Sequence, residues 1–226
     1  MLNKYMKKVL IFVLMLILLI KKCFSNDTHA NLITLLEMNY PLEFNFEQKY
    51  NNDSINGWMI IAGDGMARTE FAPPNNNLIV ADGKWIMFYD PEIDRTTYIP
   101  LDKGIFKAFL KPAALIEDKI FQIKEIQENN KIIFTLDLNI NNANQKIKIY
   151  FDKISKNLIG WKLYESLNDF IEVKIINHKK FTTDNKKFLS EIFKLTESKS
   201  NIGMKYYGPY NGRKVKKIKG GGKLNQ

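Results

Sequence analysis

The sequence has few of the residues that catalysis and metal binding require. It contains one cysteine and two histidines among 226 residues. Neither His29 nor His178 stands near a second metal-ligating residue at a recognisable spacing, so zinc and thiol chemistry are not expected. No serine lies in the G-x-S-x-G context of a nucleophile elbow, and Gly63-Asp64-Gly65 is not followed by the lysine and helix start of a phosphate loop. We therefore predict a protein that is not an enzyme and that uses no cofactor.

Long apolar runs are also scarce, with one exception near the N-terminus. Residues 1–25 hold a basic start followed by 12 apolar residues over 9–20. A helix of that length rises about 18 Å, against about 30 Å for the hydrocarbon core, so a cleaved signal peptide over 1–25 is favoured over a membrane anchor. Ser25 and Cys23 supply small residues at positions −1 and −3 of the cleavage site. The two lysines just before Cys23 weaken that site, and they also argue against lipidation of Cys23.

Excess positive charge is missing from the body of the chain, although the net charge is +10. Residues 1–25 hold five lysines and the last 14 residues hold six basic residues, and neither segment has an acid. The other 23 basic and 24 acidic residues leave 26–212 near neutral, at −1, so a nucleic-acid surface built into the fold is not expected. Residues 210–226 are predicted to form a basic, disordered tail, and a sharper hypothesis is attraction of this tail to an anionic membrane surface.

Residues 26–209 predict one domain that is mainly β. No cysteine follows residue 25, so an exported form of this domain would fold without a disulfide around a core of adequate size. Apolar or alternating runs separated by short turns predict strands in an antiparallel sheet that curls or closes. The predicted strands are 42–50, 57–62, 66–72, 78–81, 85–89, 96–99, 121–127, 131–140, 146–151, 158–164 and 170–177, and 188–195 is either a last strand or a short helix.

Two segments have the apolar spacing of helices. Residues 28–39 predict a helix that packs on the sheet and ends before Pro41. Residues 104–118 predict a second helix, which Pro112 ends or kinks. The apolar face of this second helix is predicted to comprise Ile105, Phe106, Phe109 and Leu110. A short aromatic helix in the middle of a β chain suits a lid inserted between strands, and it suits a core-packing crossover helix almost as well.

Residues 78–101 are the most informative stretch. Asp82-Gly83 and Asp90-Pro91 are turn signals that divide it into a three-stranded meander, whose middle strand is apolar on both faces and needs cover on each. The run Val80-Ala81-Asp82-Gly83-Lys84-Trp85, followed by Phe88-Tyr89-Asp90-Pro91, resembles the signature of the LolA family of periplasmic outer-membrane lipoprotein carriers. A weaker resemblance extends from about residue 32 to about residue 209.

The resemblance implies both a fold and a function. The fold would be an incomplete, strongly curved antiparallel β-barrel with a helical lid, mainly β within the α+β class. The function would be that of a monomeric periplasmic chaperone, which holds the acyl chains of lipoproteins in a hydrophobic cavity and carries them from the inner to the outer membrane. Its partners would be lipoproteins, an inner-membrane lipoprotein-release complex and an outer-membrane lipoprotein receptor, and no nucleic acid.

Strand parity and the family pattern together predict the residues that contact the acyl chains. On the strands they are Met59, Ile61, Phe71, Ile79, Ile86 and Phe88, and on the lid they are Phe106, Phe109 and Leu110. The chain departs from the family where many members carry an Arg-Pro pair whose arginine is thought to hold the lid closed, because Gly63 and Asp64 stand there instead. Arg68 resembles an arginine in the next strand of other branches, which makes it the candidate lid latch.

Two other interpretations stay open. A secreted β-module with a packed core and no lipid cavity would bind protein or the envelope surface through its basic tail. A receptor of the same fold would be anchored by Cys23, which the lysines before that residue disfavour. Deletion of the tail separates the carrier from the β-module, because only the carrier would keep its cargo.

Overall fold

The computed structural model describes residues 28–51, 53–102, 104–117, 121–140, 143–164, 169–182, 186–195 and 206–209. The predicted signal peptide (1–25) and the predicted basic tail (210–226) lie outside these residues. No helix within the described part of the chain is both long and apolar enough to span a membrane.

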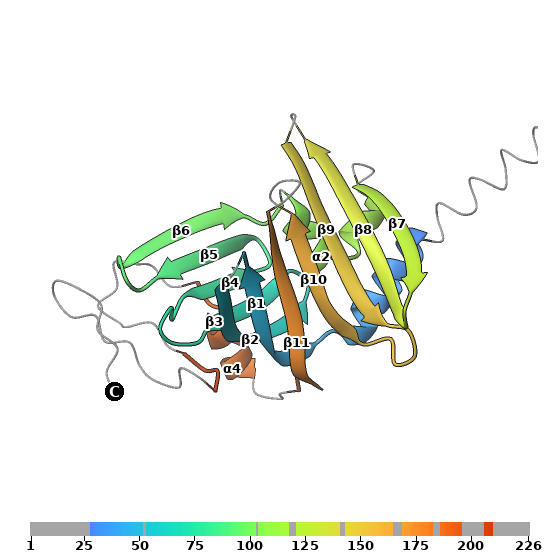
Figure 1. Cartoon of the computed structure of the whole chain (residues 1–226). Helices are drawn as coiled ribbons and strands as arrows, with labels where there is room; N and C mark the ends of the chain where they lie inside the picture. The colour runs from blue at the N-terminus through green and yellow to red at the C-terminus, as the bar shows by residue number, and fades with distance from the viewer. Residues whose placement is uncertain are drawn as a thin grey trace, which may run out of the picture.

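One antiparallel sheet of 11 strands dominates the molecule, in the spatial order β6-β5-β4-β3-β2-β1-β11-β10-β9-β8-β7. The sheet is curved and open, which confirms the predicted fold, with β6 and β7 as its two edges (Figure 1). The strands are β1 (Leu42–Tyr50), β2 (Asp53–Gly63), β3 (Met66–Phe71), β4 (Leu78–Asp82), β5 (Trp85–Asp90), β6 (Arg95–Pro100), β7 (Phe121–Glu128), β8 (Lys131–Ile140), β9 (Ala143–Asp152), β10 (Leu158–Tyr164) and β11 (Phe170–Lys180).

The chain joins the two edges of the sheet through helices. After β6 come α2 (Ile105–Leu110) and α3 (Ala114–Glu117), and β7 follows them. Because β6 and β7 are opposite edges, this connection has to cross the opening of the barrel. Figure 1 shows α2 between the wing formed by β1 to β6 and the wing formed by β7 to β10. The topology therefore makes α2 and α3 the helical lid, and Pro112 lies between them, where a break was predicted.

Irregular pairing bends the sheet at several places. The register shifts between β1 and β11, between β2 and β3, and between β9 and β10. Bulges of this kind bend a strand and increase its twist. At the last of them Gly160 has φ 152°, and a Cβ there would lie 2.2 Å from the Val173 carbonyl oxygen. A glycine at this position therefore permits a close approach of β10 to β11 that curls the barrel.

The predicted meander is confirmed as β4-β5-β6. At its first turn Gly83 has φ 93°, and the Asp82 carboxylate accepts hydrogen bonds of 2.8 Å from two backbone N–H groups, those of Lys84 and Trp85. The middle strand is fully covered on one face and partly covered on the other. Met87 and Tyr89 are buried with Tyr206 on one face, and on the other Ile86 packs against the large hydrophobic cluster of the sheet while it and Phe88 stay half-buried.

Different elements cover the two faces of the sheet. The N-terminal helix (residues 28–39), α2 and α3 pack on the inner face and form one large hydrophobic cluster with it, the inner core. Two smaller clusters lie on the outer face of β2 to β5, beneath α4 (Lys186–Ile192), Phe181 and residues 206–209. The segment left open as strand or helix over 188–195 is thus helical in its first part.

Candidate functional site

The inner core consists of apolar side chains that alternate along the strands. Successive residues of a strand point to opposite faces, and β1 places Leu42, Phe44 and Phe46 inward. The aromatic rings meet edge to face, with 5.6 Å between the centroids of Phe46 and Phe71 and 6.1 Å between those of Phe44 and Trp161. The contacts that hold this face together are therefore mostly neutral and weakly directional.

The inner face is sealed at its centre and accessible on one wing. Phe44 on β1, the middle strand of the sheet, is buried, whereas Ile79, Ile86 and Phe88 on β4 and β5 are half-buried and Ile99 on β6 is 52 % exposed. Ile86 and Ile99 are direct partners across β5 and β6, so their side chains share a face, and Ile86 packs against the inner core. We call these four half-buried or exposed residues of β4 to β6 the inner wing.

The structure brings most of the predicted contact residues together. Met59, Ile61, Phe71, Phe109 and Leu110 belong to the inner core, with Ile79 and Ile86 packed against it, and Phe88 follows Ile86 on the same face of β5. Whether these residues contact acyl chains stays a prediction.

Phe106 is the most exposed of the residues predicted for the apolar face of the lid helix. It is 43 % exposed, and the buried residues of α2 are Ile105, Ala108, Phe109 and Leu110. At about 100° per residue, Phe106 lies between Phe109 and Leu110 around the helix, so it is on the predicted side although the sheet does not cover it fully. Its contact with acyl chains stays a prediction.

The C-terminal end of α2 is bound to two other parts of the chain. The Tyr40 hydroxyl, at the end of the N-terminal helix, donates a hydrogen bond of 2.7 Å to the Phe109 carbonyl. The Gly65 N–H, in the turn between β2 and β3, donates one of 2.9 Å to the Leu110 carbonyl. Burial raises the pKa of Tyr40 far above its ordinary value, so this hydroxyl keeps its proton and remains a donor throughout the physiological range.

The Phe109 side chain reaches from α2 into the inner core. Its ring lies 6.4 Å from the Tyr40 ring, edge to face, and 5.0 Å from the Trp161 ring. At the other end of the helix, the Ile105 N–H donates to the Gln145 side-chain oxygen at 3.0 Å. The lid is thus tied to the sheet at both ends, and Phe109 fills the space beneath it.

An open groove of about 400 Å³ runs beside the C-terminal end of α2. It lies where the N-terminal helix, the β2–β3 turn and the connection between α2 and α3 meet. Its lining residues are Glu37, Tyr40, Gly63, Asp64, Lys111, Pro112, Ala113 and Ala114.

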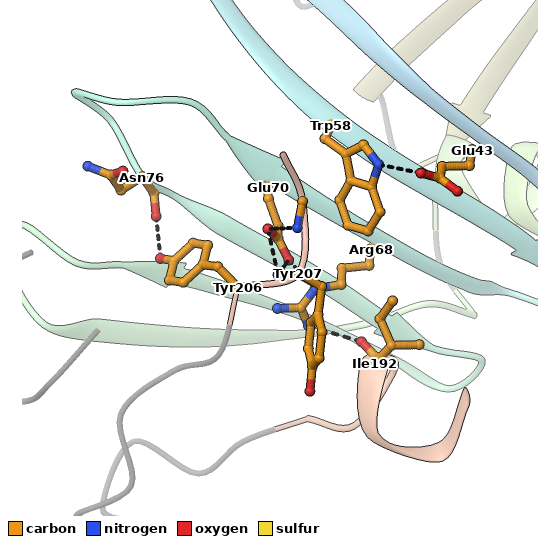
Figure 2. A network of polar contacts seen from close by, with 9 residues as sticks. Glu43, Trp58, Arg68, Glu70, Asn76, Ile192, Tyr206 and Tyr207 are labelled. Atoms are coloured by element: carbon orange, nitrogen blue, oxygen red, sulfur yellow. Dashed lines mark hydrogen bonds and ion pairs between the residues drawn. The ribbon is translucent and has the colours of Figure 1, made fainter. Parts of the chain in front are cut away.

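Arg68, the candidate latch, lies on the outer face. On β3 it has the opposite parity to Ala67 and Phe71, which belong to the inner core. Its guanidinium forms an ion pair of 2.6 Å with Glu70, donates a hydrogen bond of 2.9 Å to the Ile192 carbonyl and stacks over the Tyr207 ring at 4.9 Å (Figure 2). These contacts connect the sheet to α4 and to residues 206–209, and the role of Arg68 as a latch of α2 stays a prediction.

Glu70 holds the C-terminal segment on the outer face. Its carboxylate accepts hydrogen bonds of 2.8–3.0 Å from the N–H groups of Tyr207 and Gly208 (Figure 2). The Tyr206 hydroxyl donates to the Asn76 carbonyl. A Cβ on Gly208 would lie 2.8 Å from Trp58, so the segment passes close to the sheet only because this residue is glycine.

Several of these residues carry no signal in the sequence. Tyr40 marks the end of a helix and Gly65 marks a turn, but nothing local indicates that each donates to a carbonyl of α2. A hydrogen bond between residues 69 positions apart depends on the folded geometry. Within the described residues, no group of three or more His, Cys, Asp or Glu side chains is placed to hold a metal ion.

A curved, open β-barrel with a helical lid over an apolar inner face is the class that these features define. The chain belongs to the LolA family, because the family model described as "Outer membrane lipoprotein carrier protein LolA" matches residues 41–196. Its members are carrier proteins, which confirms that the chain is not an enzyme.

Curated relatives carry the same description. The chain is 26 % identical over 198 residues to an outer-membrane lipoprotein carrier protein of Legionella pneumophila strain Lens, covering 84 % of this chain and 95 % of the relative. It is 27 % identical over 178 residues to the carrier protein of strain Paris, covering 75 % and 87 %. Among solved structures it is similar to a LolA superfamily protein from Nitrosomonas europaea, with a TM-score of 0.39 and 8 % identity over 69 % of this chain and 96 % of that one. A similar match is MucB in complex with MucA, with a TM-score of 0.39 and 11 % identity over 82 % and 66 %.

Proposed function

We propose that this protein is a periplasmic chaperone that binds the acyl chains of lipoproteins on its inner face and carries them from the inner to the outer membrane. The observation that carries the proposal is the apolar inner face under α2, in a chain of the carrier family. An inner-membrane release complex would supply the cargo and an outer-membrane receptor would accept it. A signal peptide over residues 1–25 would direct the chain to the periplasm.

The chemistry of the inner face suits an acyl chain. Removing a CH₂ group from water is worth about 0.8 kcal/mol, so a few buried methylene groups are enough for binding. The contacts available on this face are dispersion contacts with neutral side chains, which fit cargoes that share acyl chains but differ in polypeptide. Such contacts also yield to a tighter acceptor, which a carrier requires.

The inner wing is where we place the first contact with cargo. The centre of the inner face is filled by the protein's own side chains, and Phe109 occupies the space beneath α2. Ile86, Phe88 and Ile99, in contrast, already offer partly exposed apolar surface next to the lid connection. An acyl chain would first lie along this wing and then extend inward as α2 moves away.

Adjacent residues on β6 provide a matched test. Ile99 and Tyr98 are 52 % and 41 % exposed and point to opposite faces. Ile99→Asp should weaken binding of a triacylated lipopeptide by about tenfold or more, because the apolar contact is lost and a carboxylate has to be desolvated. Tyr98→Asp should change the affinity by less than about twofold, because exposed outer-face positions contribute little. Equal losses in both variants, or none in either, would contradict the assignment.

The β-module alternative makes the opposite prediction for the tail. A carrier with residues 210–226 deleted should keep its lipopeptide affinity. Native mass spectrometry of protein purified from the periplasm should then detect lipidated polypeptide bound to both the full chain and the deletion variant. Loss of all binding on deletion would favour the β-module.

A further inference from the structure

We propose that α2 is held over the inner face by an uncharged latch, formed by the Tyr40 hydroxyl and the Gly65 amide on the last two carbonyls of the helix. The biological meaning of this latch rests on the proposed function, but its geometry does not. The latch would open for cargo to enter. Tyr40 and Gly65 are then the residues that position the lid.

The end of α2 needs partners from elsewhere. The last carbonyl groups of a helix receive no hydrogen bond from an N–H of the same helix. In α2 the Lys111 N–H donates to the Lys107 carbonyl at 2.8 Å. The Phe109 carbonyl accepts from the Tyr40 hydroxyl, and the Leu110 carbonyl accepts from the Gly65 N–H. Both donors belong to the body of the protein, so α2 cannot leave the sheet without breaking both bonds.

Tyr40 is held rigidly in the position that the latch requires. Its N–H donates to the Leu36 carbonyl at 3.1 Å, which continues the N-terminal helix to this residue. The Asn39 side chain donates to the Lys156 carbonyl at 3.0 Å and accepts from the Leu158 N–H at 2.8 Å. The end of the helix is therefore fastened to the connection between β9 and β10, and the Tyr40 hydroxyl has a fixed location when α2 arrives.

Gly65 permits the close approach of the second donor. It has φ 81°, and a Cβ there would lie 2.5 Å from the Lys111 side chain and 2.7 Å from the Leu101 side chain. Glycine at this position therefore lets the turn between β2 and β3 adopt a positive φ and lie close to the end of α2 without displacing either side chain. Gly63, two residues earlier, also has positive φ but would have no heavy atom within 4 Å of its Cβ.

The latch lies at the wall of the groove. Tyr40 and Lys111 both line it, on opposite sides of the seam between the body and the lid connection. The ring centroids of Phe109 and Trp161 are 5.0 Å apart in the closed state. Breaking the latch would move Phe109 away from Trp161 and so expose the inner core. A latch of this kind carries no net charge on either partner. Opening should therefore be insensitive to salt, unlike the opening of an arginine ion pair.

The direct test follows hydrogen exchange of the Gly65 amide in the full chain without cargo. Tyr40→Phe removes only the hydroxyl and should raise Gly65 exchange by about 2- to 12-fold, the equivalent of one net hydrogen bond. Tyr206→Phe is the matched control, because Tyr206 also donates to a backbone carbonyl, that of Asn76, but on the outer face. It should leave Gly65 exchange unchanged. No change in Tyr40→Phe, or equal changes in both variants, would overturn the proposal.

A second arm measures uptake of a fluorescent triacylated lipopeptide. Tyr40→Phe should bind it faster than the unaltered protein, and Tyr206→Phe should not. The ratio of the two rates should stay the same at about 1 M salt, where the Debye length is about 3 Å. A ratio that falls with salt would contradict an uncharged latch. If no variant binds lipopeptide, the proposed function fails, while the exchange of Gly65 still decides whether the latch exists.

Discussion

Glu70 carries a buried negative charge with unusually many partners. It is 1 % exposed, pairs with Arg68 and accepts the N–H groups of Tyr207 and Gly208. Arg68 is only 3 % exposed, so the ion pair lies in a medium of low dielectric constant, where loss of one of its two charges is costly. Glu70→Gln should lower the free energy of unfolding by about 3–5 kcal/mol, measured by urea denaturation.

A surface pair serves as the control for Glu70. Lys146 and Asp137 lie 3.4 Å apart, with side chains that are 43 % and 35 % exposed. Water screens such a pair, so Asp137→Asn should cost no more than about 1 kcal/mol. If Glu70→Gln costs no more than Asp137→Asn, the buried pair is not what holds residues 206–209 on the sheet.

Tyr89 links stability to alkaline pH. Burial, reinforced by the Asp94 carboxylate, raises the pKa of Tyr89 to about 12, whereas an unfolded tyrosine ionises near about 10. The unfolded state loses this proton first. The contribution of Tyr89 to stability is therefore complete below about pH 10 and is lost as the pH rises through about 12. Tyr89→Phe should flatten the fall of the urea midpoint between these pH values, and parallel curves for the two proteins would contradict this account.

Among the elements, β10 owes its curvature to Gly160. A Cβ at this bulge would collide with the Val173 carbonyl oxygen at 2.2 Å, and the backbone has φ 152°. Gly160→Ala should cost about 3 kcal/mol or more, since both the backbone strain and the clash oppose it. Gly63→Ala is the control, because it has positive φ and open space, and it should cost only about 1–2 kcal/mol. Urea denaturation of both variants measures the difference, and similar costs would show that β11 moves aside easily.

The strands were predictable where one face of the strand is exposed to solvent and the other is buried, because polar and apolar residues then alternate. The alternation of residues 42–50 matches β1 at both ends, and residues 131–140 match β8. β2 begins at Asp53 rather than at residue 57, because its first residues are polar and resemble a loop while the ladder with β1 continues. The segment over 188–195 stayed ambiguous because a short apolar run has no decisive period. Its helical form depends on packing against Ile60 and Trp58.

The lid was predictable as an element, but the exposure of each of its residues was not. Pro112 and the apolar composition of 104–118 indicate a short broken helix, and α2 and α3 match it. Packing on the sheet buries Ala108 and leaves Phe106 43 % exposed, which depends on the elements opposite each residue and not on the helical period. The donors to its last carbonyls come from residues about 45 and 69 positions earlier, which no local pattern reports.

At the scale of the whole molecule, the two faces of the sheet have different covers. On the outer face of β2 to β5, the two members of a buried ion pair on β3 hold the cover: Arg68 donates to a carbonyl of α4, and Glu70 accepts from backbone N–H groups of residues 206–209. On the inner face, the short helix α2 is tied by neutral hydrogen bonds at its two ends. Moving α2 therefore breaks neutral hydrogen bonds, which are weaker than the charge-assisted bonds that hold α4 and residues 206–209. The more easily displaced element lies on the inner face, which we assign to cargo.

The anchored segment also determines where the basic residues start. Residues 206–209 are fixed on the outer face, and six basic residues with no acid occur in the last 14 residues. A basic residue close to an anionic bilayer contributes about 1 kcal/mol, and about 1 M salt removes most of that attraction. Deleting residues 210–226 should therefore abolish sedimentation with phosphatidylglycerol vesicles in low salt, while leaving urea stability and lipopeptide affinity unchanged. The full chain should not sediment with neutral phosphatidylcholine vesicles. Equal sedimentation of the full and shortened chains would place membrane attraction in the near-neutral folded body instead.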